Sequence, residues 1–196
     1  MKESFLFLAD GFEEIEALTA VDVMRRAGMK VRTVSITASL QVTGAHGVTV
    51  SADVLFDNTL FADPAWLVLP GGMPGASNLY EFAPLQGLLA RQASSPEGRI
   101  AAICAAPAVV LGQTGLLEGE SATCYPGFTE MLHGAKVEAA PVVVSGKFVT
   151  AAGPGMATRW ALTIVEEACG HEISRQVAAG MLIYEAAENG ATDYYI

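Results

Sequence analysis

The sequence has no long apolar run and few basic residues. Hydrophobic residues make up 52% of the 196, but they occur in runs of about four to eight, short of the roughly eighteen that cross a membrane. Eleven Lys and Arg oppose 21 Asp and Glu, and the formal charge of −10 repels nucleic acid and anionic lipid. The apolar segment at residues 5–9 is too short for a signal peptide. We therefore expect a cytoplasmic protein with neither a nucleic-acid nor a membrane partner.

Several binding and catalytic motifs are also missing. The three cysteines and three histidines lack the spacing of a disulfide framework, a C-x-x-C pair or a metal site, so we predict a reducing compartment and no metal. There is no G-x-x-x-x-G-K-[ST], and the first strand-to-helix turn is acidic where a dinucleotide site would present glycines. We accordingly predict no cofactor. The absence of G-x-S-x-G argues against a serine hydrolase.

Strand and helix patterns alternate through the first two thirds of the chain. Apolar strands are expected at residues 5–9, 31–36, 66–69 and 100–103, and a helix capped by Asp10 should follow the first strand and end at Gly28. This alternation predicts an α/β fold with a mostly parallel sheet and helices on both faces. Antiparallel hairpins are expected at residues 40–51 and 142–150, the second turning at Ser145-Gly146. With no break in composition, we expect one domain over residues 1–184 and a polar tail over 185–196.

Residues 99–112 contain the strongest candidate for chemistry, Cys104. Residues 100–103 are typical of a strand buried on both faces, and Pro107 suits the first turn of a helix. Cys104 would therefore lie at a strand-to-helix corner, where unpaired N–H groups and the helix dipole favour the thiolate. We predict a nucleophilic thiol with a pKa below the free value of about 8.5. A buried structural cysteine is the alternative, and this stretch alone leaves both interpretations open.

Three carboxylates lie at the start of the first predicted helix. For Glu13 and Glu14 the favoured interpretation is a solvated face that complements the helix N-terminus. Glu16 lies about 200° round the helix from Glu14 and could point inward, toward the carboxyl ends of the strands. There the segment 10–16, the Gly71-Gly72 loop and Cys104 should converge. An ionised carboxylate would raise the thiol pKa, so such a pair works only if burial protonates Glu16 and its O–H donates to sulfur.

Five segments together resemble the ThiJ/PfpI superfamily. They are FLFLADGFEEIE at 5–16, VDVMRRAG at 21–28, LPGG at 69–72, AICAAP at 102–107 and GPG at 153–155. The likeness runs in order from about residue 3 to about residue 183. It is closest to the branch of the Parkinson-disease protein deglycase and its bacterial relatives. The resemblance implies a flavodoxin-like three-layer sandwich and a homodimer.

The resemblance also implies roles for individual residues. Cys104 corresponds to the family nucleophile and Glu16 to the protonated glutamate that hydrogen-bonds it. Gly72 and Ala105 match the positions whose backbone N–H groups point at a bound oxygen, although a plain tight turn is the alternative for the glycine pair. The remaining candidates for the substrate pocket are Gly71, Tyr125, Pro126, His46 and Arg26.

Three positions depart from the family pattern. Ala105 stands where the protease branch has histidine, which argues against a Cys-His peptidase. Tyr125 occupies a place where the human protein has histidine and bacterial relatives have tyrosine. His46 replaces an arginine that in close relatives helps to line an anion site near the cysteine.

Two functions from different classes follow. The first is a cofactor-independent enzyme that converts small 2-oxoaldehydes, such as methylglyoxal, to hydroxy acids, or repairs their early adducts on proteins. In this hypothesis the partner is a small carbonyl substrate, attacked by the Cys104 thiolate while Glu16 moves protons. The alternative is a non-catalytic sensor of oxidative stress, or a chaperone, that acts through oxidation of Cys104. Both use the same residues, so an assay has to separate them.

Overall fold

A seven-stranded sheet forms the centre of the protein in the computed structural model, which describes residues 2–183, 185–186 and 192–193. The strand order is β10-β11-β7-β6-β1-β2-β5, and every neighbouring pair is parallel except β10 with β11. The strands are β1 (Ser4–Leu8), β2 (Val31–Ser35), β5 (Val54–Leu55), β6 (Trp66–Leu69), β7 (Arg99–Ile103), β10 (Val142–Ser145) and β11 (Phe148–Ala151). The predicted, mostly parallel sheet is therefore confirmed.

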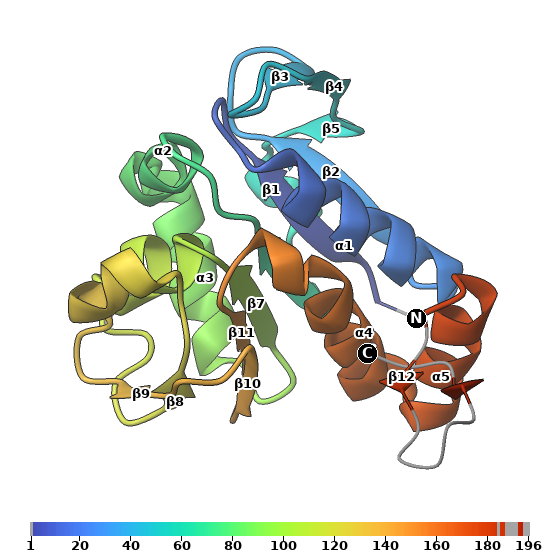
Figure 1. Cartoon of the computed structure of the whole chain (residues 1–196). Coiled ribbons are helices and arrows are strands. Elements are labelled where there is room, and N and C mark those ends of the chain that lie inside the picture. Colours follow the sequence, from blue (N-terminus) through green and yellow to red (C-terminus); the bar gives the residue numbers. More distant parts are fainter. Residues whose placement is uncertain (1, 184, 187–191, 194–196) are drawn as a thin grey trace.

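Helices cover both faces of this sheet (Figure 1). On one face lie α1 (Glu14–Arg26), α4 (Ala157–Cys169) and α5 (His171–Gly180), with α4 in contact with both of the others. On the other lie α2 (Gly75–Glu81), α3 (Ala83–Ser94) and a π-type helix, Pro107–Gly112. Three short 3-10 helices complete the helical elements of the described residues: Asn58–Leu60, Pro126–Met131 and Pro154–Met156. None of the helices that the structure describes is both long enough and apolar enough to span a membrane.

The core consists of two apolar layers separated by the sheet. In β1, Leu6 and Leu8 face the layer under α1 and α4, whereas Phe5 and Phe7 face the opposite layer. Strands buried on both faces need apolar residues at every position, which explains their continuous runs in the sequence. Trp160 of α4 is fully buried, and its indole N–H donates to the Val149 carbonyl of β11 at 3.2 Å.

The two predicted hairpins form, with differences at their edges. The first pairs β3 (Gln41–Thr43) with β4 (Thr49–Ser51), but the pair is a separate two-stranded sheet rather than an extension of the central one. The second pairs β10 with β11 and turns at Gly146-Lys147, one residue later than predicted. A further small sheet pairs β8 (Ser121–Ala122) with β9 (Lys136–Val137).

The start of α1 differs from the prediction. The sequence predicts Asp10 as the N-cap, but the N-cap is Glu13, whose carboxylate accepts the backbone N–H of Glu16 at 2.7 Å. Asp10 instead accepts the backbone N–H of Thr43 at 3.0 Å, because the first hairpin passes close to this turn. The helix ends at Arg26, and Gly28 two residues later has a φ of +77°, the predicted left-handed stop.

The predicted polar tail falls largely outside the described residues. Within it, β12 (Glu185–Ala186) pairs antiparallel with β13 (Thr192–Asp193). Residues 184, 187–191 and 194–196 lie outside the described part of the chain.

Apolar side chains are exposed along one side of α1. Ile15 is 59% exposed and Leu18, one turn on, is 44% exposed. Val48, 50% exposed, lies in the first hairpin's turn, which Glu14 ties to α1 by accepting the backbone N–H groups of His46 (2.7 Å) and Val48 (3.4 Å). An apolar strip of this kind is typical of a surface that a partner covers.

We expect this strip to bind a second copy of the chain. Sedimentation equilibrium at micromolar concentration should show twice 20.4 kDa. Leu18→Glu should give the monomer with unchanged circular dichroism, because a charge would be buried in the interface. Val144→Glu, at a comparably exposed position on β10, is the control and should stay dimeric. A wild-type species of 20.4 kDa would contradict the prediction.

Candidate active site

The loops that follow β1, β6 and β7 meet at the carboxyl edge of the sheet. The chain runs outward from β1 to β2 on one side and through β6 and β7 on the other, so the strand order reverses between β1 and β6. Parallel sheets bind ligands at such a reversal. Gly71, after β6, donates its backbone N–H to Glu16 Oε2 at 2.7 Å, and a Cβ on it would lie 2.7 Å from Cys104 Cβ. The structure therefore brings together the three segments that the sequence singled out.

Cys104 occupies a sharp corner between β7 and the helix that begins at Pro107. Its φ is +63°, in the left-handed region, where a non-glycine residue costs about 1–3 kcal/mol. The corner is held on both sides, because the Cys104 N–H donates to Ala151 O (2.9 Å) and its carbonyl accepts from Tyr125 N (2.8 Å). The backbone N–H groups of Gly72 and Ala105 reach the sulfur. The thiol is half-buried at a nucleophile elbow.

Glu16 is fully buried beside this thiol. Its Oε2 accepts the Gly71 N–H, whereas Oε1 has no partner of ordinary hydrogen-bond geometry among the described residues. The neighbouring titratable group is the Cys104 thiol, with which the carboxyl interacts. An unpaired oxygen of a buried carboxylate is costly, but a protonated Oε1 becomes a donor for the sulfur. The geometry thus favours the protonated form of Glu16.

The electrostatics of the pair correct one prediction. Burial raises the pKa of Glu16 to about 7, against the hydrogen bonds from Gly71 and Cys104. Burial, and next the charge of Glu16, raise the pKa of Cys104 to about 12, although the N–H groups of Ala105 and Gly72 act in the opposite direction. The predicted acidic thiol is therefore wrong for Cys104 beside an ionised Glu16, because desolvation and the carboxylate outweigh the helix start.

The raised pKa values of Glu16 and Cys104 belong to one coupled pair of titrating groups. The first proton leaves at a pH of about 7, and the second only near 12. Between these limits the pair holds one proton, on sulfur or on Glu16. Cys104 is a thiolate whenever that proton resides on Glu16.

Of the other candidates, two border the Cys104 corner and His46 lies at the start of α1. Tyr125 donates its backbone N–H to the Cys104 carbonyl, its ring lies against Phe128 and close to Gly153, and Pro126 follows it, so both candidates border the site. His46 is exposed, and its Nδ1 lies 2.8 Å from Glu14 Oε2 at the start of α1.

Arg26 requires a correction. It lies ten residues beyond Glu16 on α1, about 15 Å along the helix axis, where it pairs with Asp22 at 2.7 Å. Within one copy of the chain it does not line the pocket of Cys104. The cause is simple helix geometry, because a side chain in the last turn of α1 cannot reach a group beside its first turn.

Sequence reasoning missed the burial of Glu13 and Glu14, which lie beside Glu16 at the start of α1. Both are buried, contrary to the predicted solvated face, because the first hairpin turn packs over them and a Cβ on Gly44 would lie 2.4 Å from Glu14 Cδ. Helical periodicity cannot predict burial by a hairpin turn that lies about thirty residues later in the sequence. Ligand atoms of Glu13, Glu14 and His46 lie within 4.8 Å of one another, but the two carboxylates already bind Glu16 N and His46. We assign no metal to them.

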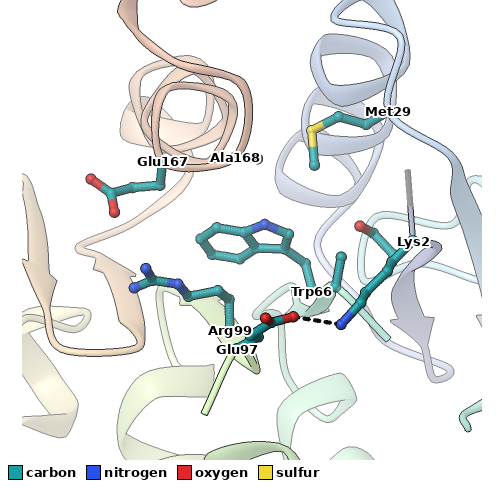
Figure 2. A pocket seen from close by; sticks show the side chains of 9 residues that line it. Lys2, Met29, Trp66, Glu97, Arg99, Glu167 and Ala168 are labelled. Carbon is teal, nitrogen blue, oxygen red and sulfur yellow. Dashed lines mark hydrogen bonds and ion pairs between the residues drawn. The ribbon is translucent and has the colours of Figure 1, made fainter. Parts of the chain in front are cut away.

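A separate cavity lies at the opposite, amino edge of the sheet (Figure 2). It has a volume of about 240 Å³ and is lined by Ser4, Trp66 and Arg99, among others, with Lys2 bonded to Glu97 at 2.7 Å. The five residues of β7 separate it from Cys104 by about 16 Å. Its lining contains no thiol or imidazole, so it is not part of the candidate active site.

Comparison with known proteins identifies the family. The model of the DJ-1/PfpI family matches residues 2–167. The chain belongs to the DJ-1/PfpI family. It is 36% identical to DJ-1 homolog B of Arabidopsis thaliana over 184 residues, which cover 93% of this chain and 42% of the plant protein. It is 32% identical to a deglycase of Pyrococcus abyssi over 155 residues, or 78% of this chain and 90% of that protein.

A solved DJ-1 structure confirms the fold. Oxidized DJ-1 of Toxoplasma gondii gives a TM-score of 0.89 at 36% identity, covering 93% of this chain and 98% of that one. The predicted family and the predicted flavodoxin-like α/β fold are thereby confirmed. The chain spans less than half the length of the Arabidopsis relative, so that protein's full activity does not transfer to it directly.

Gly71→Ala should disrupt the pair without unfolding the sheet. The added Cβ would lie 2.7 Å from Cys104 Cβ and 2.9 Å from Glu16 Oε2, so the two groups must move apart. We expect the rate of Cys104 alkylation by iodoacetamide at pH 8 to fall several-fold. Gly87→Ala is the control, since its nearest contact is an ordinary 3.8 Å and its rate should be unchanged. An unaltered rate in Gly71→Ala would show that the close approach of the loop is not needed.

Proposed function

We propose that this DJ-1/PfpI protein is a cofactor-independent cysteine enzyme that acts on small 2-oxoaldehydes, with Cys104 as nucleophile and Glu16 as proton carrier. The observation that carries the proposal is a fully buried carboxyl beside a thiol at a strained corner, with the pKa of the carboxyl raised by burial to about 7. Such a pair supplies a nucleophile and an acid/base group within one contact. The deglycase from Pyrococcus abyssi supports a substrate with an aldehyde-derived carbon.

The first step adds the thiol across the aldehyde. With the shared proton on Glu16, the thiolate attacks the aldehyde carbon and the carbonyl π electrons move to oxygen. That oxygen develops negative charge where the N–H groups of Gly72 and Ala105 can stabilise it, and it then takes the proton of Glu16. The product is a hemithioacetal on Cys104, and Glu16 is left as a carboxylate.

The next steps move hydrogen within the substrate. The Glu16 carboxylate removes the proton from the carbon bonded to sulfur, while water protonates the neighbouring ketone oxygen, which gives an enediol and hydroxide. The hydroxide takes the hydroxyl proton of the sulfur-bearing carbon as Glu16 returns its proton to the second carbon, which yields a thioester, so one carbon is oxidised as the other is reduced. Water then cleaves the thioester to a hydroxy acid and restores the thiol. The sum is addition of one water, which requires no external oxidant, reductant or cofactor.

The assay follows methylglyoxal consumption and lactate formation in the absence of glutathione. Cys104→Ser should fall to the background rate, and Glu16→Gln should slow turnover by about 10²–10⁴-fold because the acid/base group is lost. Cys124→Ser is the control and should stay active, since the Cys124 thiol is buried in the apolar layer and donates to the Tyr125 carbonyl, outside the Cys104–Glu16 pair. An active Cys104→Ser variant would refute the proposed nucleophile.

The same assay has a defined pH dependence. The reactive form carries one proton on the pair, so the wild-type rate should rise with a midpoint near pH 7, where the first proton leaves. In Glu16→Gln the thiol must ionise alone, and burial opposes this, so the midpoint should move to higher pH.

An oxidation sensor remains the second candidate, because a relative has been solved in an oxidized form. Cys104 combines partial exposure with a neighbouring carboxyl, Glu16, to which its proton can pass. Burial raises the pKa of Cys124 to about 11 and also raises that of Cys169, and no carboxyl contributes to either shift. Only the thiolate reacts readily with peroxide.

Mild peroxide should therefore add two oxygens to the Cys104 peptide before the other two cysteines change. A protonated Glu16 can donate to a sulfinate oxygen and so oppose further oxidation. Peptide mass analysis over a peroxide series measures this order. Earlier oxidation of Cys124 or Cys169, or a predominant disulfide at Cys104, would exclude the sensor.

A further inference from the structure

Glu13, Glu16 and Gly71 close a ring of three hydrogen bonds at the start of α1. The Glu13 carboxylate accepts the Glu16 N–H at 2.7 Å, and Glu16 Oε2 accepts the Gly71 N–H at 2.7 Å. The Gly71 carbonyl in turn accepts the Glu13 N–H at 3.0 Å. Each residue donates once and accepts once, so the ring fixes the Glu16 carboxyl relative to both the helix and the loop.

We propose that Glu13 is a positioning residue of the Cys104–Glu16 pair: its carboxylate orients Glu16 through this ring, and its negative charge biases the shared proton toward Glu16. The inference rests on the proposed function in that it concerns the same pair. Glu13 does not touch the sulfur itself. Its effect is on which of the two partners carries the proton.

The charges around the pair support this bias. Glu16 faces Glu13 from the start of its own helix and Cys104 from the elbow, and the charge of Glu13 raises the pKa of Glu16. Negative charge nearer to Glu16 than to sulfur disfavours the carboxylate more than the thiolate. A shared proton therefore resides more on Glu16 when Glu13 is ionised.

Glu13 is held in place for this role. It is buried, one oxygen caps α1, and the other lies 3.9 Å from His46 Nδ1 in the hairpin turn. Its neighbour Glu14 is equally buried, but its oxygens bind the His46 N–H at 2.7 Å and Nδ1 at 2.8 Å. Glu13, and not Glu14, contributes to the raised pKa of Glu16. Glu14 therefore offers a matched control one residue away.

The test measures thiolate absorbance near 240 nm against pH, with Cys104→Ser as the blank. Glu13→Gln keeps an oxygen that can cap the helix but removes the charge. Its midpoint should move about 0.5–1 pH unit lower, because the first proton leaves more easily, and its thiolate plateau should fall. Glu13→Asp should keep the wild-type midpoint and plateau, and Glu14→Gln should change neither. Repeating the series with His46→Gln excludes titration of the imidazole as the source of the step.

A lower midpoint with a lower plateau in Glu13→Gln alone supports the inference. Equal changes in Glu13→Gln and Glu14→Gln, or no change in either, would overturn it. If Glu13→Gln fails to fold, thermal melting will show it. In that case Glu13→Asp is the test: a wild-type midpoint and plateau support the inference, and a changed midpoint or plateau contradicts it. The thiolate titration does not depend on turnover. If Glu13→Gln shows the lower midpoint but the wild-type protein consumes no methylglyoxal, the proposed function is refuted and the positioning role of Glu13 still holds.

Discussion

A buried carboxyl beside a thiol is the constraint on which the rest of the site depends. Glu16 is fully buried, and among the described residues the Gly71 N–H is the one backbone donor to its side chain. A charged carboxylate in such a place costs several kcal/mol, whereas a protonated one needs only a nearby acceptor. The Cys104 sulfur is the nearby group that can accept from a protonated Glu16. The ionisation of Cys104 on the elbow after β7 thus depends first on its own burial and next on a side chain buried on the inner face of α1.

The sheet supplies the stiffness that the elbow needs. Cys104 holds a positive φ that costs about 1–3 kcal/mol, and a free loop would relax it. Its N–H is bound to the end of β11 and its carbonyl to Tyr125, so relaxation would break two backbone hydrogen bonds. Gly72, in the loop after β6, also helps to keep this corner rigid. Gly72 has a φ of +87°, and a Cβ there would lie 2.4 Å from Glu13 N, so no larger residue fits between the loop and α1.

Prediction from sequence succeeded where the cause is local and failed where it comes from distant segments. The change from strand to helix at Cys104 and the inward-facing position of Glu16 on α1 depend on a few neighbouring residues, so the sequence predicts both. The burial of Glu13 and Glu14 depends on a hairpin turn that joins them only in the fold, and helix periodicity contains no trace of it. The direction of the Cys104 pKa failed for the same reason, since the helix start is local but the desolvation is not. Arg26 was misplaced because family resemblance gives a residue's identity but not its distance.

The shared proton also explains why enzyme and sensor hypotheses use the same residues. A carbonyl carbon and a peroxide oxygen are both attacked by the thiolate, so both reactions draw on the state with the proton on Glu16. This protonation state therefore does not distinguish the enzyme from the sensor, but the steps that follow thiolate attack do. Turnover requires a second proton transfer by Glu16 and a water that cleaves the thioester, whereas a sulfinate requires only that the oxidised sulfur be held. In the proposed enzyme Glu16 therefore moves protons both as acid and as base, whereas in the proposed sensor it is a donor that stays protonated.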